Sequence, residues 1–337
     1  MKAIVQHRYG PPHEVLELTE IVKPSAEPGE VLLQVKAASM HPDVWHVVRG
    51  WPYMLRLMGS GLRKPKVPVP GIDLAGVVES VGGKATRFRP GDEVFGEIVK
   101  GHQWKNGGAY AQYVAVSESR LEHKPSNLTF EQAAALPTSG VLALQGLQSE
   151  GRIKPGDRVL VNGAGGAVGS LAVQIAKALE CEVTAVDSAA KQDTLRAIGA
   201  DRVIDYGAED FTLGGQRYDL ILDIPGNRSF NDLKRVLAEG GRYVLIGHDQ
   251  YGASGNRWFG GTIGRFIKLQ LLAPFGRPKK DTGAPAETTN PLVVLRELVE
   301  AGKVSPAIDR TFPLAEVPEA IAYQASGAAR GKIVITI

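Results

Sequence analysis

The chain has 337 residues, 43% of them hydrophobic and 22% charged, with a formal net charge of only +3. This length is sufficient for two domains, and the small charge gives no reason to expect a nucleic-acid or membrane partner. No run approaches the roughly 20 apolar residues of a membrane span. The single cysteine, Cys181, excludes a disulfide within the chain, and the start "MKAIVQHRYG" lacks the apolar core of a signal peptide, so we expect a cytoplasmic location.

The first 125 residues have the character of strands. Segments 30–39 and 73–82 are rich in valine and leucine and are bounded by turn residues. Pro-Gly-Asp turns precede further apolar segments at 90–92 and 155–157. The sequence therefore predicts a β-rich domain over 1–125.

From Thr129 onward, helices and strands alternate. Thr129 and Gln132 have the spacing of a capping box before an alanine-rich helix. Short apolar strands then alternate with helical segments, in the order "RVLVNGA", "CEVTAVD", "ADRVIDY", "YDLILDIPG" and "GRYVLIG". Repeated βα units of this kind predict a doubly wound α/β domain with a parallel sheet covered on both faces, which we place at 126–285.

The remaining segment, 286–337, contains one clear helix, "NPLVVLRELVEAGKV", and ends on the strand "KIVITI". We expect this return segment to complete the sheet of the first domain. Both ends of the chain would then belong to one unit.

A glycine cluster follows the strand "RVLV" and opens a helix. Gly163, Gly166 and Gly169 allow a sharp turn and the close approach of a pyrophosphate to the amides of the helix N-terminus. The G-x-G-x-x-G pattern has Ala164 at its first position. Because the cluster stands inside a βαβ unit with an acidic residue after the next strand, we expect it to bind a dinucleotide. The alternative is a structural turn.

Asp187 ends the next strand. Its carboxylate is placed to accept the ribose hydroxyls of NAD and to repel the 2′-phosphate of NADP. Ser188 and Lys191 follow and favour a phosphate, so we expect both NAD and NADP to be accepted, with Asp187 restraining NADPH. A helix-capping role for Asp187 is the alternative.

Ligands of doubly wound sheets bind outside the carboxyl ends of the strands. Pro225, Gly226 and Gly247 end the fourth and fifth strands, where they border the nicotinamide half or serve as simple turns. The candidate cofactor-binding residues of this domain are Gly163, Ala164, Gly166, Ala167, Val168, Gly169, Asp187, Ser188, Lys191, Tyr206, Pro225, Gly226 and Gly247.

Six phrases spread along the chain carry a family resemblance: "VPGIDLAGVVESVG", "RFRPGDEVFG", "GGAYAQYVAV", "FEQAAALPTSGVLALQGL", "VLVNGAGGAVGSLAVQIAKAL" and "IGADRVIDY". The chain resembles the medium-chain dehydrogenase/reductase superfamily, in its zinc-independent quinone oxidoreductase branch. The resemblance implies a discontinuous GroES-like catalytic domain, a Rossmann domain, an active site between them, NAD(P)(H) as cofactor and a homodimer. It places Thr138 in the segment that faces the nicotinamide ribose or amide.

The resemblance also bears on zinc. The family's Gly-His-Glu segment is Gly71-Ile72-Asp73 here, so isoleucine replaces a ligand histidine, and a catalytic zinc needs three protein ligands. We therefore expect no metal. We expect the substrate to be a quinone or an α,β-unsaturated carbonyl compound, because its conjugated oxygen can take up the negative charge of the arriving hydride without a Lewis acid. The alternatives are a zinc-type alcohol dehydrogenase and a nucleotide-binding protein without turnover.

The catalytic candidates come from "SMHPDVWHVVRGWPY". Where quinone reductases usually have Asn-Pro, this chain has His41-Pro42, and we expect His41 to donate to the substrate oxygen. Trp45, Trp51 and Tyr53 are candidates to stack on a flat substrate ring. The alternatives are a packed loop histidine and aromatic side chains that belong to the core.

Overall fold

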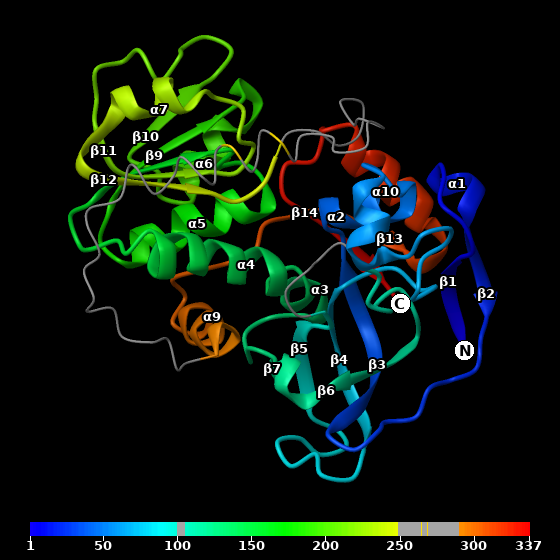
Figure 1. The fold of residues 1–337 in the computed structure, drawn as a ribbon. Helices are drawn as coiled ribbons and strands as arrows, with labels where there is room; N and C mark the ends of the chain where they lie inside the picture. Colours follow the sequence, from blue (N-terminus) through cyan, green and yellow to red (C-terminus); the bar gives the residue numbers. More distant parts are fainter. Residues whose placement is uncertain (100–104, 249–263, 265–267, 269–289) are drawn as a thin grey trace. The chain divides into compact units, whose positions relative to one another are not determined.

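The computed structural model describes residues 1–99, 105–248, 264, 268 and 290–337 (Figure 1). The chain divides into two compact units. Of the described residues, Met1–Thr138 and Pro306–Ile337 form the first unit, and those between 139 and 305 form the second. The two units are described separately below.

The first unit is built on antiparallel β-structure. A seven-stranded sheet has the order β13-β14-β3-β4-β5-β7, with β6 also paired to β3, and β1 and β2 form a separate hairpin. The strands are β1 (Lys2–Gln6), β2 (Leu16–Glu20), β3 (Glu30–Ser39), β4 (Asp73–Val81), β5 (Glu93–Glu97), β6 (Tyr113–Ser117), β7 (Leu121–His123), β13 (Ile308–Pro313) and β14 (Lys332–Thr336). Because β14 pairs with β3, the end of the chain lies in the same sheet as its beginning, and the expected discontinuous β-rich domain is confirmed.

Four helices accompany this sheet in the described part of the first unit: α1 (Pro12–Val15), α2 (Pro42–Arg49), α3 (Phe130–Ala134) and α10 (Val317–Ala325). Helix α10 packs against α1 and α2, and α3 packs against β3 and β4. Shorter segments are a π-helical turn at Arg56–Ser60 and 3₁₀ turns at Glu118–Arg120 and Leu314–Glu316. The predicted capping box at Thr129 and Gln132 is present at the start of α3.

The second unit contains a five-stranded parallel sheet of order β10-β9-β8-β11-β12. Its strands are β8 (Arg158–Asn162), β9 (Glu182–Asp187), β10 (Arg202–Asp205), β11 (Tyr218–Asp223) and β12 (Leu237–Leu245). The helical segments are α4 (Pro137–Leu144, which starts in the first unit), a π-helical turn (Gln145–Glu150), α5 (Ala167–Ala178), a 3₁₀ turn (Ala189–Lys191), α6 (Gln192–Ala197), α7 (Phe230–Val236) and α9 (Pro291–Glu300). The expected Rossmann fold is confirmed.

The sequence of this sheet explains where its polar residues lie. Residues 159–161 of β8 and 220–222 of β11 are completely buried, as expected for strands covered on both faces. Each of three neighbouring strands nevertheless ends on a polar residue: Asn162, Asp187 or Asp223. These side chains gather at the carboxyl edge of the sheet, where such folds bind ligands.

The division of the chain lies at 138/139 and 305/306, later in the sequence than the expected 125/126 and 285/286. Helix α3 stays with the first unit because it packs on β3 and β4. Helix α9 belongs to the second unit, where Leu295 fills the space over Gly140 of α4. Position 285 lies outside the described residues.

Candidate functional site

The three glycines of the loop after β8 have three different local environments. Gly163 has φ +82°, which the turn requires and which side chains other than glycine rarely adopt. A Cβ on Gly169 would lie 2.3 Å from the carbonyl oxygen of Gly163, so α5 packs directly on the loop. A Cβ on Gly166 would meet nothing closer than 3.6 Å. The fold therefore does not require glycine at 166, and binding of a pyrophosphate at this N-terminus of α5 stays a prediction.

The residues around Gly166 complete this cradle. The N–H groups of Gly163 and Ala164 both donate to the carbonyl of Val186, which fixes the loop to β9. Ala164 is fully buried, so its methyl group does not project into the open space. Ala167 and Val168 form the first turn of α5. Their backbone N–H groups belong to the part of a helix that has no intrahelical acceptor and is available to an anion.

Asp187 is 7% exposed, and both of its carboxylate oxygens have partners. Oδ2 accepts from the backbone N–H of Gly165 at 2.7 Å, and Oδ1 accepts from the N–H of Ser188 at 2.8 Å. The ammonium group of Lys191 lies 3.3 Å from Oδ1. Tyr206 donates its backbone N–H to the Asp187 carbonyl and has an exposed ring. The residues predicted to bind the adenosine half of the cofactor thus lie together. The Asp187 carboxylate, however, is hydrogen-bonded to the glycine loop.

A second group of predicted residues lies at the ends of β11 and β12. A Cβ on Gly163 would be 3.0 Å from Cδ of Pro225, and one on Gly226 would be 3.2 Å from the carbonyl oxygen of Gly247. The structure therefore brings these loops together beside the glycine turn. Contact between any of these residues and a cofactor stays a prediction.

Buried Asp223 holds this second group in place. Its carboxylate accepts from Asn162 Nδ2 at 2.8 Å, from the N–H of Gly226 at 3.1 Å and from the hydroxyl of Tyr243 at 2.9 Å. The sequence-based search missed Asp223 and Asn162. Both residues are polar and end a predicted apolar strand, and this pattern is the signal that could have identified them.

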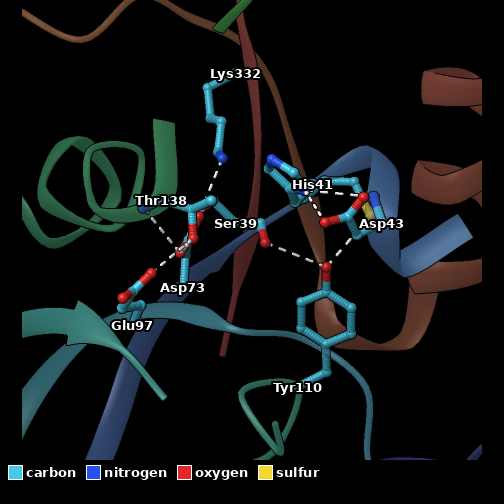
Figure 2. A network of polar contacts seen from close by, with 9 residues as sticks. Ser39, His41, Asp43, Asp73, Glu97, Tyr110, Thr138 and Lys332 are labelled. Atoms are coloured by element: carbon cyan, nitrogen blue, oxygen red, sulfur yellow. Dashed lines mark hydrogen bonds and ion pairs between the residues drawn. The ribbon is translucent and has the colours of Figure 1, made fainter. Parts of the chain in front are cut away.

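In the first unit, the ends of three adjacent strands carry a buried polar network, which Figure 2 shows. Ser39 is the register partner of Asp73, and Asp73 is the register partner of Glu97. The fully buried Asp73 carboxylate accepts from the Thr138 N–H at 3.1 Å and hydroxyl at 2.5 Å, and from the Ser39 hydroxyl at 3.3 Å. The ammonium of Lys332 lies 3.1 Å from its Oδ2. These four donors surround a charge that would otherwise be costly to bury.

Glu97 lies beside this carboxylate with its side chain 15% exposed. Burial and the neighbouring Asp73 carboxylate raise the pKa of Glu97 to about 7, although Arg120, the Thr138 hydroxyl and His41 act in the opposite direction. Arg120 Nη1 is 3.3 Å from Oε1, and the Thr138 hydroxyl is 3.5 Å from Oε2. Glu97 is therefore a carboxyl group that exchanges its proton close to neutral pH.

His41 and Tyr110 lie on the other side of Ser39 (Figure 2). His41 is buried and caps α2, because its Nδ1 accepts from the backbone N–H of Asp43 at 3.3 Å. Oδ2 of the Asp43 carboxylate also lies 3.4 Å from Nδ1, a contact that favours a hydrogen on this nitrogen. Tyr110 is completely buried and its hydroxyl donates to the Ser39 carbonyl at 3.2 Å. Burial and the Asp73 charge raise the pKa of Tyr110 well above its ordinary value, so Tyr110 stays protonated.

The other sequence candidates of this unit have different surroundings. Trp45 lies in the apolar core, edge-on to His46 and Trp51, which favours the core alternative over substrate stacking. Tyr53 is 41% exposed, with the Arg56 guanidinium 4.8 Å from the ring centroid. Thr138 uses both its N–H and its hydroxyl on Asp73. The catalytic role of Tyr53 and the cofactor contact of Thr138 stay predictions.

In the described parts of the chain, no three His, Cys, Asp or Glu side chains are grouped so that they could hold a metal ion. Burial raises the pKa of Cys181 to about 11, which keeps it a thiol, whereas zinc binds the thiolate. Ile72, the residue in the position of the family's ligand histidine, is buried in the first unit.

Comparisons with known proteins agree with this fold. Residues 27–126 match the family model described as alcohol dehydrogenase GroES-like domain, and residues 198–335 match the model described as zinc-binding dehydrogenase. The mitochondrial NAD(P)H oxidoreductase RTN4IP1 of Bos taurus is 34% identical over 100% of this chain and 89% of its own. The chloroplastic NADPH-dependent alkenal/one oxidoreductase of Arabidopsis thaliana is 33% identical over 99% of this chain and 79% of its own. The solved quinone oxidoreductase of Coxiella burnetii has a TM-score of 0.79 at 29% identity, covering 100% of this chain and 99% of that one.

The chain belongs to the medium-chain dehydrogenase/reductase superfamily, in its quinone oxidoreductase-like branch. It is an oxidoreductase that uses a nicotinamide cofactor. In the described residues, none of the helices has the length and apolar character needed to cross a lipid bilayer. The two relatives named above are mitochondrial and chloroplastic, so the cytoplasmic location expected here, like the homodimer, stays a prediction.

Proposed function

We propose that the protein transfers a hydride from NADPH to a quinone or an α,β-unsaturated carbonyl compound without a metal ion. The observation that carries the proposal is the glycine loop after β8, which leaves room at Gly166 at the N-terminus of α5, beside Asp187 and Lys191. The names of the relatives support the acceptor class, since they are an alkenal/one oxidoreductase and a quinone oxidoreductase.

The choice of NADPH follows from the surroundings of Asp187. Its two oxygens accept from the N–H groups of Gly165 and Ser188, which lowers their capacity to accept ribose hydroxyls. The Lys191 side chain already lies over Gly165, because a Cβ built on Gly165 would be 2.3 Å from Cδ of Lys191. The ammonium group of Lys191 lies 3.3 Å from Asp187 Oδ1 and offsets the Asp187 charge. We therefore propose a preference for NADPH that depends on Lys191, and the expected restraint of NADPH by Asp187 stays a prediction that Asp187→Ser tests.

The residues of this chain then have separate tasks. The glycine loop and the first turn of α5 hold the pyrophosphate, and Asp223 fixes the loops that border the nicotinamide half. When bound, the reduced nicotinamide supplies the hydride. His41 donates an N–H to the oxygen on which negative charge collects, a role that a preorganised donor performs without a Lewis acid.

Absorbance of the reduced cofactor tests the proposal directly. Purified protein is mixed with NADPH and, in turn, enones, quinones, saturated ketones and aldehydes. We expect NADPH oxidation with the first two classes only, unchanged by a chelator. Oxidation of primary alcohols with NAD that stops in chelator would instead identify a zinc-type alcohol dehydrogenase, and tight cofactor binding without turnover would identify a binding protein.

A further inference from the structure

Exposed apolar side chains are concentrated in one segment of the first unit, residues 53–67. Leu57 is 62% exposed and Leu62 is 65% exposed, and Tyr53 and Val67 are also exposed. A single exposed leucine is ordinary, but several in one short segment mark an interaction surface. We call residues 53–67 the docking loop.

The fold fixes the backbone of the docking loop while its leucines stay outside. The Tyr9 hydroxyl donates to the Gly61 carbonyl at 2.6 Å, and the Arg56 guanidinium lies 4.3 Å from the centroid of the Tyr9 ring. The Gly61 N–H donates to the Arg56 carbonyl at 3.2 Å. Leu57 and Leu62 directly follow these two bonded residues, so they leave the loop from neighbouring positions of the backbone.

The docking loop is also basic. Residues 44–72 contain no aspartate or glutamate. The side chain of Lys105 lies against the loop, because a Cβ built on Gly59 would be 2.7 Å from Cε of Lys105. The exposed basic side chains of this surface are Arg63, Lys64, Lys66 and Lys105. Positive charge therefore stands beside the exposed leucines.

The segments bonded to the docking loop bring no negative charge to it. The Gln6 N–H donates to the Pro68 carbonyl at 2.7 Å, and Asn106 Nδ2 donates to the Val67 carbonyl at 2.9 Å. The stretches that supply these donors, 1–13 and 105–117, contain no aspartate or glutamate. Within the described residues, none of the four basic side chains forms an ion pair with a carboxylate. The small net charge of the whole chain thus conceals a local excess that is free for an external partner.

We propose that the docking loop binds the protein to the surface of an anionic lipid bilayer. Leu57 and Leu62 enter the boundary of the acyl chains, while the lysine and arginine side chains reach the phosphates of the headgroups. An acidic protein would satisfy the charges alone. A bilayer supplies an apolar layer directly beneath a negative one, which is the pairing that this loop presents. The proposal goes beyond the proposed function and does not depend on turnover.

Sedimentation with lipid vesicles tests the docking surface. The purified protein is mixed with vesicles of phosphatidylcholine alone or of phosphatidylcholine with phosphatidylglycerol. We expect it to sediment with the mixed vesicles and not with the neutral ones, and the bound fraction to fall as salt is added. A protein that stays in the supernatant with both kinds of vesicle at low salt would overturn the proposal.

Two double variants separate the charges from the leucines. Lys64→Glu with Lys66→Glu, and Leu57→Ser with Leu62→Ser, should each lower the vesicle partition coefficient by about tenfold or more. All four side chains are exposed, so both proteins should unfold at the wild-type temperature. The matched controls are Leu213→Ser, which is 71% exposed, and Lys234→Glu on α7, both in the second unit. Full binding by either double variant, or an equal loss in the controls, would overturn the proposal.

A fluorescent label tests whether the loop enters the bilayer. The single cysteine, Cys181, is buried, so a thiol introduced at the surface is labelled selectively. We expect an environment-sensitive dye on Leu57→Cys to shift its emission to the blue with mixed vesicles, and the same dye on Leu213→Cys to show no shift. Sedimentation without a shift at position 57 would mean adsorption by charge alone and would overturn the proposal.

Discussion

The carboxylate of Asp187 accepts a hydrogen bond from the backbone N–H of Gly165, with 2.7 Å between the two atoms. The acidic residue that ends β9 is therefore part of the structure of the loop that follows β8. A residue at this position is usually considered only for its contact with the ribose. Here the same carboxylate also orders the loop that is to hold the pyrophosphate, and the two roles have different consequences on substitution.

Asp187→Ser should weaken the binding of both cofactors. The shorter side chain removes the acceptors of the Gly165 and Ser188 N–H groups, so the loop loses the bonds that order it. We expect KM to rise several-fold for both NADPH and NADH, consistent with the loss of about 1 kcal/mol per hydrogen bond. Steady-state kinetics with each cofactor measures this. A lower KM for NADPH with an unchanged KM for NADH would show that Asp187 acts only by repelling the 2′-phosphate.

Lys191→Ala should distinguish the two cofactors. The Lys191 ammonium is the basic group that lies on Asp187 beside the cradle, so its removal takes away the partner of a 2′-phosphate. We expect about a tenfold higher KM for NADPH, equivalent to ~1.4 kcal/mol, and little change for NADH. Arg196→Ala, an exposed substitution on α6, is the matched control. Equal losses with both cofactors would show that Lys191 supports the loop rather than the phosphate.

Two glycine substitutions should separate binding from stability. Gly166→Ala places a Cβ in open space, so the protein should unfold at the wild-type temperature while its affinity for NADPH falls about tenfold or more. Gly169→Ala forces a Cβ against the backbone of the loop at 2.3 Å, which should lower stability by about 1–3 kcal/mol. Calorimetric titration and thermal unfolding measure the two effects. Full affinity in Gly166→Ala would place the pyrophosphate elsewhere.

Glu97 should make the stability of the protein depend on pH. Because the pKa is raised from 4.5 to about 7 in the folded state, the unfolded chain releases this proton first as the pH increases. The folded state then loses stability between pH 4.5 and 7, by about 2–3 kcal/mol, and no more above that range. Glu97→Gln lacks this loss, so the wild type should lose stability relative to it as the pH is raised from 4.5 to 7.5. Urea unfolding at several pH values measures the difference, and a constant difference would contradict the raised pKa.

Local sequence patterns were sufficient for the fold and for the grouping of the glycine loop with Asp187. The strand, glycine loop, helix and Asp187 lie close together in the sequence, and their spacing predicts their geometry. The contact of Lys332 with Asp73 joins residues 259 positions apart, and no periodicity indicates it. Glu97 meets Asp73 only through the register of two strands. The network of the first unit therefore became visible only in three dimensions.

Environment also decided the roles of single side chains. Trp45 was considered for substrate stacking, but the structure places it in the core of the first unit, where α2 packs against α1 and α10. His41 caps α2, which no sequence pattern distinguished from a free donor. Asp187 is bonded to Gly165 because the turn after β8 aims an N–H group at the end of β9. Residue identity alone does not report such partners.

The most direct test of the account is the stoichiometry of a single reaction. Metal-free protein, prepared with a chelator and checked by elemental analysis, is incubated with NADPH and a simple enone, and the product is identified by mass spectrometry. The account predicts one saturated carbonyl compound per NADPH oxidised, at the same rate with and without added zinc. A reaction that requires zinc, or an acceptor reduced at the carbonyl to an allylic alcohol, would contradict it.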